Sequence, residues 1–543
     1  MTDTPTTGSP PPDEENEEIE DNPEFENPYE LFRDPDTYEV RVESDLEIED
    51  YEKSTPPEDW AMILSWAKQL AETDASVVFI NPTMEGGGVA MMRPPLIHLM
   101  TLLGIEAHWY VMEIEDGLPD DKNPAVITKK IHNKLHGSSN EPLTPDDKER
   151  HIQWADGENG PILEKQEAIR NATYLVIDDP QPTPLIDRLK MANPDAKLIW
   201  RYHIHTDGKA MADPNTTQGE VGTYLLDELG VDRVDAVMTH PVEDFVNPRL
   251  DKITTFGPAT IELNDAFNRK LSEQEVSSGI DFINSDIDKN NQLLIEAGRE
   301  NEVQATLSKE PRRKRITLIA RFDPQKGMDL GIKMGVQTRQ KMRDAGVPED
   351  ELPEIVIVGN GSIDDPDGPT ILEKLLAERM QLPEQDRNSV IIARLPHNPN
   401  AINALMENSD FIMQPSTAEG FETRVTDAII HGIPVVVSSR GGIKTQVIEG
   451  MSGLVLDFHK PDYDLPKGAE FLSYHLMNRV AYEELVRTTK QAAEEFNKRE
   501  FVTAANAARW MRLFLTLRNN ESIDRKWKMS EFVNSYQDEL IAA

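Results

Sequence analysis

The sequence contains no cysteine among its 543 residues. This absence excludes a disulfide framework, a cysteine-ligated zinc or iron–sulfur site, and catalysis by a thiol. The chain also lacks an apolar run of the ~18–20 residues that a membrane-spanning helix needs. Its first residues have neither the basic segment nor the apolar core of a secretory signal peptide. We therefore expect a cytoplasmic protein.

Basic residues are scarce relative to acidic ones. The chain has 56 Lys and Arg against 98 Asp and Glu, which gives a formal net charge of -42. Affinity for nucleic acid and for anionic lipid depends on neutralising phosphates with Lys and Arg. The charge therefore predicts that neither a nucleic acid nor a membrane surface is a partner.

Acidic residues are especially dense at the N-terminus. The segment 2–28 is rich in Pro, Glu and Asp and has few apolar side chains. Such a segment cannot bury enough apolar surface to offset the entropy of ordering. We expect residues 1–37 to form a disordered acidic tail, either a solubilising segment or an arm that binds a partner.

Beyond residue 60, short apolar strands alternate with helix-like stretches in two series. This rhythm is typical of parallel sheets with helices on both faces, so the predicted fold class is α/β. The first series of predicted strands comprises 76–82, 106–112, 173–178, 197–203, 236–240 and 252–257. The second series comprises 316–321, 354–359, 389–394, 410–415, 434–439 and 453–457.

Two series of similar size predict two Rossmann-like domains that face one cleft. The expected boundaries are 38–260 for the N-terminal domain, 261–314 for a polar helical linker and 315–500 for the C-terminal domain. Residues 501–543 are expected to form C-terminal helices, because their first part is apolar at helical spacing. Ligands of open parallel sheets bind at the carboxyl ends of the strands, so the loops after the strands are the candidate site.

A glycine-rich loop directly follows the first predicted strand and contains Gly86, Gly87 and Gly88. Glycines at a strand-to-helix turn let backbone N–H groups point at a phosphate or a sugar. The spacing is not Gly-x-Gly-x-x-Gly, and no Gly-Lys-Ser/Thr follows, which argues against a nicotinamide dinucleotide site and against a P-loop. The alternative is a simple tight turn.

Two cations, Arg321 and Lys326, follow the first strand of the second series. A planar guanidinium and a compact ammonium at this place can bracket a diphosphate. The alternative is a set of ordinary surface ion pairs.

A third loop carries Glu419, Gly420 and Phe421, with Asp427 eight residues after the glutamate. This spacing puts the two carboxylates about two turns apart on roughly the same side of a helix. The first can accept hydrogen bonds from sugar hydroxyls, the second can hold a ribose, and the helix N-terminus favours a phosphate. Alternatively, the acidic residues only stabilise the first turn of the helix.

Together, these loops resemble the retaining glycosyltransferases of family 4, which have the GT-B fold of two Rossmann-like domains around a central cleft. Further segments are similar to the trehalose-forming glycosyltransferring synthases and to the related trehalose phosphorylases. They are Gly104–Val111, Ile127–Asn133, Asp179–Pro182, Trp200–Ile204, Asp364–Gly368 and Gly441–Gln446. The similar blocks run from about residue 38 to residue 515.

The resemblance implies a retaining glucosyltransferase that forms α,α-trehalose reversibly from a nucleoside-diphosphate glucose and glucose. The first alternative is a trehalose phosphorylase, which converts trehalose and phosphate into glucose and glucose 1-phosphate. The alternative of another class is a catalytically silent GT-B protein that binds a partner. In each case a homodimer is left open.

The resemblance also assigns roles to residues. Arg321 and Lys326 would stabilise the leaving phosphate, and Glu419 would bind hydroxyls of the donor sugar. The implied donor-binding residues are Gly86, Gly87, Gly88, Gly420, Phe421 and Asp427. The implied residues of the acceptor and sugar pocket are Arg201, His203, His132 and Asn133. Asp427 stands where the family has a second Glu, and His205 stands where synthases usually have Asp.

No metal or other cofactor is expected. Asp364, Asp365 and Asp367 lack EF-hand spacing, and Asp-Pro-Asp-Gly is an ordinary turn sequence. His203 and His205 share one face of a strand without an evident third ligand. We favour a same-face substitution in which the leaving phosphate takes the acceptor proton. A double displacement with paired carboxylates is the other route to retention.

Overall fold

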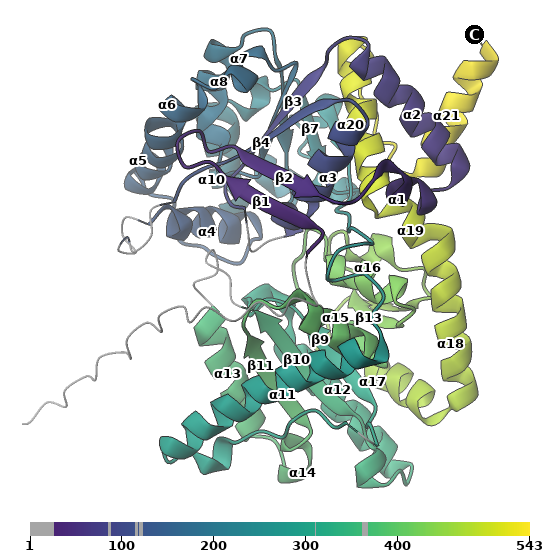
Figure 1. Ribbon diagram of the computed structural model, residues 1–543. Coiled ribbons are helices and arrows are strands. Elements are labelled where there is room, and N and C mark those ends of the chain that lie inside the picture. Colours follow the sequence, from purple (N-terminus) through teal and green to yellow (C-terminus); the bar gives the residue numbers. More distant parts are fainter. Residues whose placement is uncertain are drawn as a thin grey trace, which may run out of the picture.

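The computed structural model describes residues 27–84, 88–114, 118, 123–309, 311–360 and 368–542. The described chain forms two parallel six-stranded sheets and one two-stranded antiparallel sheet. In Figure 1 the first parallel sheet lies in the upper half of the molecule and the second in the lower half, each among helices. The predicted α/β class with two Rossmann-like domains is confirmed.

The first sheet has the strand order β4-β3-β5-β6-β7-β8. Its strands are β3 (Ser76–Asn81), β4 (Glu106–Val111), β5 (Tyr174–Asp178), β6 (Lys197–Arg201), β7 (Ala236–Thr239) and β8 (Thr254–Phe256). Each coincides with a predicted strand to within a few residues. The chain order reverses between β3 and β5, which makes the space beside these two strands the topological switch point.

The second sheet has the order β11-β10-β9-β12-β13-β14, and its switch point lies between β9 and β12. Its strands are β9 (Arg315–Ile319), β10 (Glu354–Asn360), β11 (Val390–Leu395), β12 (Phe411–Gln414), β13 (Val435–Ser438) and β14 (Gly453–Leu456). All six predicted strands of this series are present. Their apolar runs are continuous because helices cover both faces of the sheet.

Helices complete the two domains. Those of the first domain are α1 (Ile48–Lys53), α2 (Pro57–Ala71), α3 (Gly88–Leu102), α4 (Pro124–Leu135), α5 (Pro145–Ile152), α6 (Gly160–Leu163), α7 (Glu167–Asn171), α8 (Ile186–Ala192), α9 (Gly208–Ala212) and α10 (Thr217–Thr223). Those of the second domain are α12 (Met328–Asp344), α13 (Gly368–Met380), α14 (Glu384–Arg387), α15 (Pro399–Glu407), α16 (Thr423–Ile430), α17 (Pro461–Met477) and α18 (Arg479–Ala492).

The segment expected to be a linker contains one long helix, α11 (Glu273–Glu296). The Ser272 side chain accepts a hydrogen bond from the Glu275 N–H, and the Glu275 side chain accepts one from the Ser272 N–H. This capping box satisfies two backbone donors and fixes the start of the helix. Ile280 and Ile283 are buried in the core of the second domain. The helix is therefore packed on that domain along one side.

The chain returns to the first domain at its C-terminal end, through α19 (Lys498–Glu500), α20 (Thr503–Arg518) and α21 (Met529–Ala542). Trp510 packs edge-on against Phe79 of β3, with the ring centroids 5.3 Å apart. Figure 1 shows α20 and α21, in yellow, beside α2 at the top of the molecule. The crossing chain ties the two domains together on one side.

The predicted boundary of the disordered tail, residue 37, lies after the first strand of the structure. Residues 1–26 lie outside the described part, but β1 (Tyr29–Arg33) pairs antiparallel with β2 (Val40–Ser44). Tyr29 is buried and its hydroxyl lies 2.9 Å from the Tyr51 hydroxyl. The prediction of disorder up to residue 37 is thus wrong for this strand, because alternate side chains find partners on the first domain.

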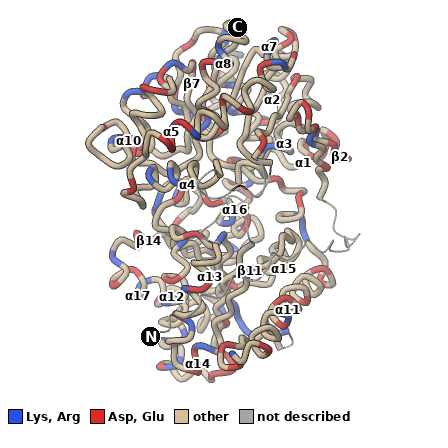
Figure 2. The backbone as a smooth tube through the Cα atoms, turned by 90° about the vertical axis from the view of Figure 1, so that its left-hand side faces the viewer, with Lys and Arg blue, Asp and Glu red and all other residues tan. Residues whose placement is uncertain are grey.

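Charged residues are spread over both domains in Figure 2, with Asp and Glu on many different elements. No helix among the described residues is long and apolar enough to cross a membrane.

Candidate active site

A cavity of about 290 Å³ lies between the two domains. The loops after β3 and β5 line it from the first domain, and the loops after β9 and β12 line it from the second. The switch points of the two sheets thus face each other across the cavity. Ligands of open parallel sheets bind at such points, so this cavity is the candidate active site.

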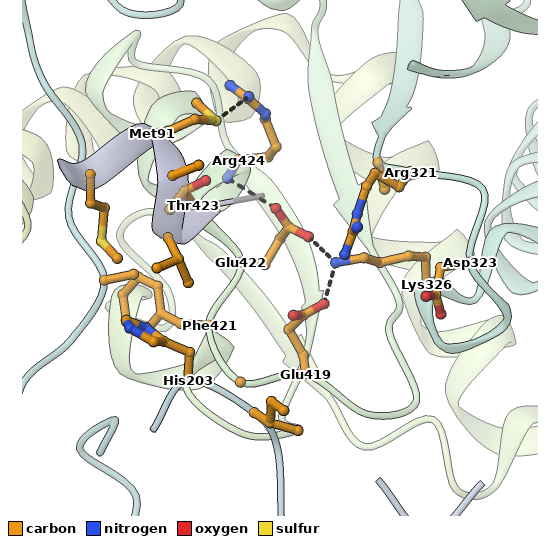
Figure 3. Close-up of a pocket in the computed structure, with 18 of the residues that line it drawn as sticks. Met91, His203, Arg321, Asp323, Lys326, Glu419, Phe421, Glu422, Thr423 and Arg424 are labelled. Atoms are coloured by element: carbon orange, nitrogen blue, oxygen red, sulfur yellow. Dashed lines mark hydrogen bonds and ion pairs between the residues drawn. The ribbon is translucent and has the colours of Figure 1, made fainter. Parts of the chain in front are cut away.

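Lys326 is held between two carboxylates on the second-domain wall. Its Nζ lies 2.5 Å from Glu419 Oε2 and 2.6 Å from Glu422 Oε2. The three side chains are only 10–14% exposed. Figure 3 shows the ammonium group between the two glutamates, with the Arg321 side chain alongside. Buried charges of opposite sign are therefore concentrated at one point of the wall.

The protonation of this cluster follows from its burial. Burial raises the pKa of Glu419 to about 7, although the Lys326 charge opposes that shift. Burial also disfavours the charged form of Glu422, but Lys326 outweighs it and the pKa of Glu422 falls below its usual value. The pKa of Lys326 is raised, because the two carboxylates outweigh the cost of burying its charge. Lys326 is thus a permanent cation, and Glu419 can change charge near neutral pH.

Glu422 also caps the helix that follows. It is the N-cap residue of α16, and its Oε1 accepts a 3.3 Å hydrogen bond from the Arg424 N–H. The Val425 N–H donates to the Glu422 carbonyl. A side-chain acceptor just before the first turn satisfies a donor that the helix itself leaves unpaired.

The loop after β9 places Arg321, Asp323 and Lys326 along the cavity. Asp323 accepts hydrogen bonds from the Gln325 N–H at 2.9 Å and, across the cleft, from Lys129 Nζ at 2.9 Å. Gln325 Nε2 in turn lies 2.8 Å from Ser138 Oγ of the first domain. This loop therefore both lines the site and joins the two domains.

The first-domain wall is built around His203, which follows β6. Its Nε2 donates to Asp178 Oδ1 at 3.0 Å, and its backbone N–H donates to Asp179 Oδ1 at 2.8 Å. Asp178 is also paired with Arg93 at 2.5 Å. Burial holds the pKa of His203 well below its usual value. The ring is therefore neutral at pH 7, and its other nitrogen can accept a hydrogen bond from a hydroxyl.

Further histidines surround this wall. The rings of His132 and His136 in the first domain are tilted to each other with centroids 4.3 Å apart, and the His136 ring stacks on that of His205 at 5.9 Å. Burial lowers the pKa of His136 and that of His205. His205 Nδ1 donates to the Glu419 carbonyl at 3.2 Å. Neutral rings of this kind suit the hydroxyl groups of a sugar better than they suit an anion.

Gly420 allows the closest approach of the two walls. A Cβ atom at this position would lie 2.0 Å from the His203 carbonyl oxygen. Only glycine therefore lets the loop after β12 meet the loop after β6 in this arrangement.

Most of the predicted site residues line the cavity. They are Arg321, Lys326, Glu419, Gly88, Gly420, Phe421, His203 and His132. Gly86 and Gly87 lie outside the described residues.

Three predicted residues do not line the cavity. Asp427 is buried and its Oδ2 is paired with Arg424 at 2.6 Å. Arg201 is buried beneath the wall, where it donates to the Gly257 carbonyl at 2.6 Å. The Asn133 carbonyl accepts hydrogen bonds from Ser138, and Asn133 is not among the residues that line the cavity. These three residues therefore lie outside the lining of the cavity.

Several lining residues were not predicted, among them Glu422, Arg424, Asp179 and His136. Glu422 and Arg424 lie inside a recognised motif, but only the ends of that motif were assigned roles. Asp179 directly follows a predicted strand, and this position alone marks it as a candidate. His136 lies one helical turn after His132, so the helical period would place both on one face.

The described residues contain no group of three or more His, Asp or Glu side chains placed to hold a metal ion. The predicted turn with Asp364, Asp365 and Asp367 lies outside the described residues.

Comparison with known protein families matches both halves of the chain. The family described as "Trehalose synthase, N-terminal domain" matches residues 79–246. The family described as "Family 4 Glycosyltransferase in conflict systems" matches residues 280–459. The two matched regions contain the loops on opposite sides of the cavity.

Proteins similar to this chain in sequence are named trehalose phosphorylase or trehalose synthase. A trehalose phosphorylase of Grifola frondosa is 30% identical over 482 residues, which is 86% of this chain and 60% of that protein. A trehalose synthase of Thermococcus litoralis is 29% identical over 451 residues, which is 82% of this chain and 92% of that protein. The chain spans about three fifths of the length of the first curated relatives that it matches.

The fold has solved counterparts. The α,α-trehalose 6-phosphate synthase of Burkholderia multivorans matches with a TM-score of 0.54 and 13% identity, over 82% of this chain and 99% of that one. The match to this solved structure shows a fold of the GT-B class. The family match adds that residues 280–459 are similar to family 4 glycosyltransferases. Within that class the chain resembles the trehalose synthases and trehalose phosphorylases, as its sequence predicted.

Proposed function

We propose that this protein is a retaining glucosyltransferase that forms or cleaves α,α-trehalose. One observation carries the proposal. Arg321, Lys326 and Glu419 line one wall of the interdomain cavity, and the neutral His203 and His136 line other parts of it. Cations and a hydroxyl acceptor on one side, with neutral hydrogen-bonding rings nearby, suit a glucosyl phosphate and a sugar. The names of the relatives support the same substrates.

The arrangement suggests how the chain would lower the barrier. As the bond from glucosyl C1 to the phosphate oxygen breaks, negative charge grows on the leaving group. Arg321 and Lys326 are already in place, so they stabilise that charge without reorganising. Glu419 would accept hydrogen bonds from donor hydroxyls and orient the ring. We propose that the reaction needs no metal and that the leaving phosphate takes the acceptor proton on the same face.

The first candidate reaction uses a nucleotide sugar. NDP-glucose and glucose give trehalose, NDP and a proton: the C1–O bond to the diphosphate breaks, and C1 bonds to the anomeric oxygen of the acceptor. The cavity supports this reading because its lining extends beyond the charged cluster to include Gly359, His397 and Pro399. That extension offers space for more than a phosphate.

The second candidate is the phosphorylase reaction. Trehalose and phosphate give glucose and glucose 1-phosphate: the glycosidic C1–O bond breaks, C1 bonds to a phosphate oxygen, and the phosphate proton moves to the released glucose. Asp427 favours this reading, because it is paired with Arg424 and does not line the cavity, so it is not placed to hold a ribose.

The experiment is to incubate the full chain with trehalose and either phosphate, UDP or ADP, and to identify the products by NMR. Formation of α-glucose 1-phosphate supports the phosphorylase reaction, and formation of α-NDP-glucose supports the synthase. A β-linked product would contradict retention. No turnover with any of the three would contradict the proposal and favour a catalytically silent binding protein.

A further inference from the structure

Lys326 has two carboxylate partners in the cavity wall, Glu419 and Glu422. Glu419 is the residue expected to bind donor hydroxyls, yet Glu422 Oε2 also lies 2.6 Å from the same Nζ. Figure 3 shows Glu422 bridging the ammonium of Lys326 and the backbone of Arg424. Glu422 is buried and lines the cavity. Its negative charge is therefore built into the anion-binding wall itself.

The place that Glu422 occupies is one that ordinarily attracts phosphate. The N-terminus of a helix after a central strand of a Rossmann-like sheet binds a pyrophosphate, because free N–H groups and the helix dipole point at it. Here the helix is α16, and the Glu422 side chain already accepts from its Arg424 N–H. A phosphate at this position would have to displace that carboxylate or lie against it.

The other charges near α16 do not compensate for Glu422. The cation of Arg424, which lines the cavity, is paired with Asp427 at 2.6 Å. Asp323 on the same wall is paired with Lys129 at 2.9 Å. Lys326 itself faces two carboxylates. A second phosphate at the helix N-terminus would thus meet the Glu422 carboxylate and, nearby, an Arg424 guanidinium already paired with Asp427.

Building on the proposed function, we propose that Glu422 selects the glucosyl donor. Its carboxylate takes the place of the second phosphate of a nucleoside diphosphate, so the site prefers a donor or acceptor with a single phosphate group, which is glucose 1-phosphate or inorganic phosphate. Arg321 and Lys326 remain the groups that receive this phosphate. The like charge of Glu422 excludes a diphosphate by repulsion, which is how interfaces commonly reject wrong ligands.

The test compares the wild type with Glu422→Gln. Glutamine removes the charge, keeps the side-chain length and retains an oxygen that can accept from the Arg424 N–H. Trehalose formation from glucose is measured with glucose 1-phosphate, ADP-glucose and UDP-glucose as donors. The wild type should prefer glucose 1-phosphate. In Glu422→Gln, the ratio of kcat/KM for NDP-glucose to that for glucose 1-phosphate should rise roughly tenfold or more, where tenfold corresponds to about 1.4 kcal/mol.

The matched control is Glu273→Gln, an exposed glutamate in the first turn of α11. It should leave the donor ratio unchanged. An unchanged ratio in Glu422→Gln, or a wild type that uses NDP-glucose at least as well as glucose 1-phosphate, would overturn the role of Glu422 and leave the proposed glucosyl transfer standing. A wild type that reacts with none of these donors would overturn both.

Binding measured without turnover gives a second readout. Inorganic phosphate and inorganic pyrophosphate are titrated into the full chain by calorimetry. The wild type should bind phosphate more tightly than pyrophosphate, and Glu422→Gln should reverse or abolish that order. Should Glu422→Gln fail to fold, the wild-type titration and the charge-conserving Glu422→Asp decide: equal or tighter binding of pyrophosphate to both would contradict the proposal.

Discussion

Lys129 of α4 in the first domain forms an ion pair with Asp323 of the second domain, with Nζ and Oδ2 2.9 Å apart. The two side chains are 10% and 5% exposed. The pair bridges the cleft beside Lys326, so the geometry of the charged cluster depends on how closely the domains approach.

Replacing Lys129 should loosen this contact. Lys129→Met leaves the Asp323 carboxylate without its cation in a buried place, and removal of one partner of a buried pair costs about 3 kcal/mol. We expect a lower free energy of unfolding in urea and a higher KM for the glucosyl donor. The double variant Lys129→Met/Asp323→Asn should recover part of the lost stability and part of the lost donor affinity, because it no longer buries the Asp323 carboxylate without Lys129. Equal losses in single and double variants would show that the pair does not couple the domains.

The same pair predicts acid sensitivity. Burial disfavours the charged form of Asp323, but Lys129 outweighs it and lowers the pKa from 3.8 to about 2. A carboxyl whose pKa is lower in the folded state stabilises the fold above its unfolded pKa. Its contribution is therefore complete above pH ~4 and is lost as the pH falls toward 2. Unfolding followed by circular dichroism between pH 5 and 2 should show a smaller decline in Asp323→Asn than in the wild type.

Lys326→Ala should lower kcat by roughly 10²-fold or more, because a preorganised charge in a site that excludes water is worth about 3 kcal/mol to the transition state. The structure adds a second effect. Without the ammonium, Glu419 and Glu422 face each other unneutralised, so the variant should also be less stable at pH 8 than at pH 6. Steady-state kinetics and thermal unfolding at both pH values check this. Turnover near the wild-type rate would exclude the catalytic role of Lys326.

The rate should depend on pH through Glu419. Burial raises its pKa to about 7, and the neighbouring Glu422 charge adds to the shift. If the ionised form binds donor hydroxyls, kcat/KM rises with pH through about 7. In Glu422→Gln this acid limb should move to lower pH, because one like charge is gone. If the acid limb of kcat/KM does not move in Glu422→Gln, the limb belongs to another group. A flat profile between pH 6 and 8 would show that ionisation of Glu419 does not control the rate.

The strands of both sheets could be predicted because each is a short apolar run between polar turns. The β1–β2 hairpin could not be predicted, because Tyr29 and Val40 lie among acidic residues in the sequence. Only the structure shows that these two side chains are buried. The positions of the site loops also followed from the sequence, because ligands bind after the strands of an open parallel sheet. Fold class and cleft are thus consequences of local pattern.

Which side chains enter the cavity could not be predicted. Arg201 is the last residue of β6 and His203 lies two residues after it, yet Arg201 donates to the Gly257 carbonyl while His203 lines the site. Asp427 was expected to hold a ribose, but its partner Arg424 lies only three residues before it and pairs with it. Such choices depend on charges brought together by the fold, which spacing along the chain does not specify.

Because Asp427 is paired with Arg424, its replacement should affect stability rather than nucleotide binding. Asp427→Asn removes the buried partner of Arg424, which should lower the free energy of unfolding by about 1–3 kcal/mol. Because the carboxylate does not line the cavity, the KM values for nucleotide and non-nucleotide donors should change by similar factors. Asp427→Glu serves as the charge-conserving control. A loss confined to nucleotide donors would restore the ribose-binding role.

Gly420→Ala should separate activity from folding. The added Cβ would lie 2.0 Å from the His203 carbonyl, which belongs to the opposite domain. Opening the cleft relieves this clash without disturbing either core, so the unfolding midpoint should change little. The same opening moves Glu419 and Lys326 away from the first-domain wall, and kcat/KM should fall by about 10²-fold, as expected when reacting groups are misplaced by ~1 Å. Gly368→Ala is the control, because its Cβ would meet other atoms only at 3.9 Å and beyond. A variant that keeps full activity would show that the enzyme works with its domains further apart than they lie here.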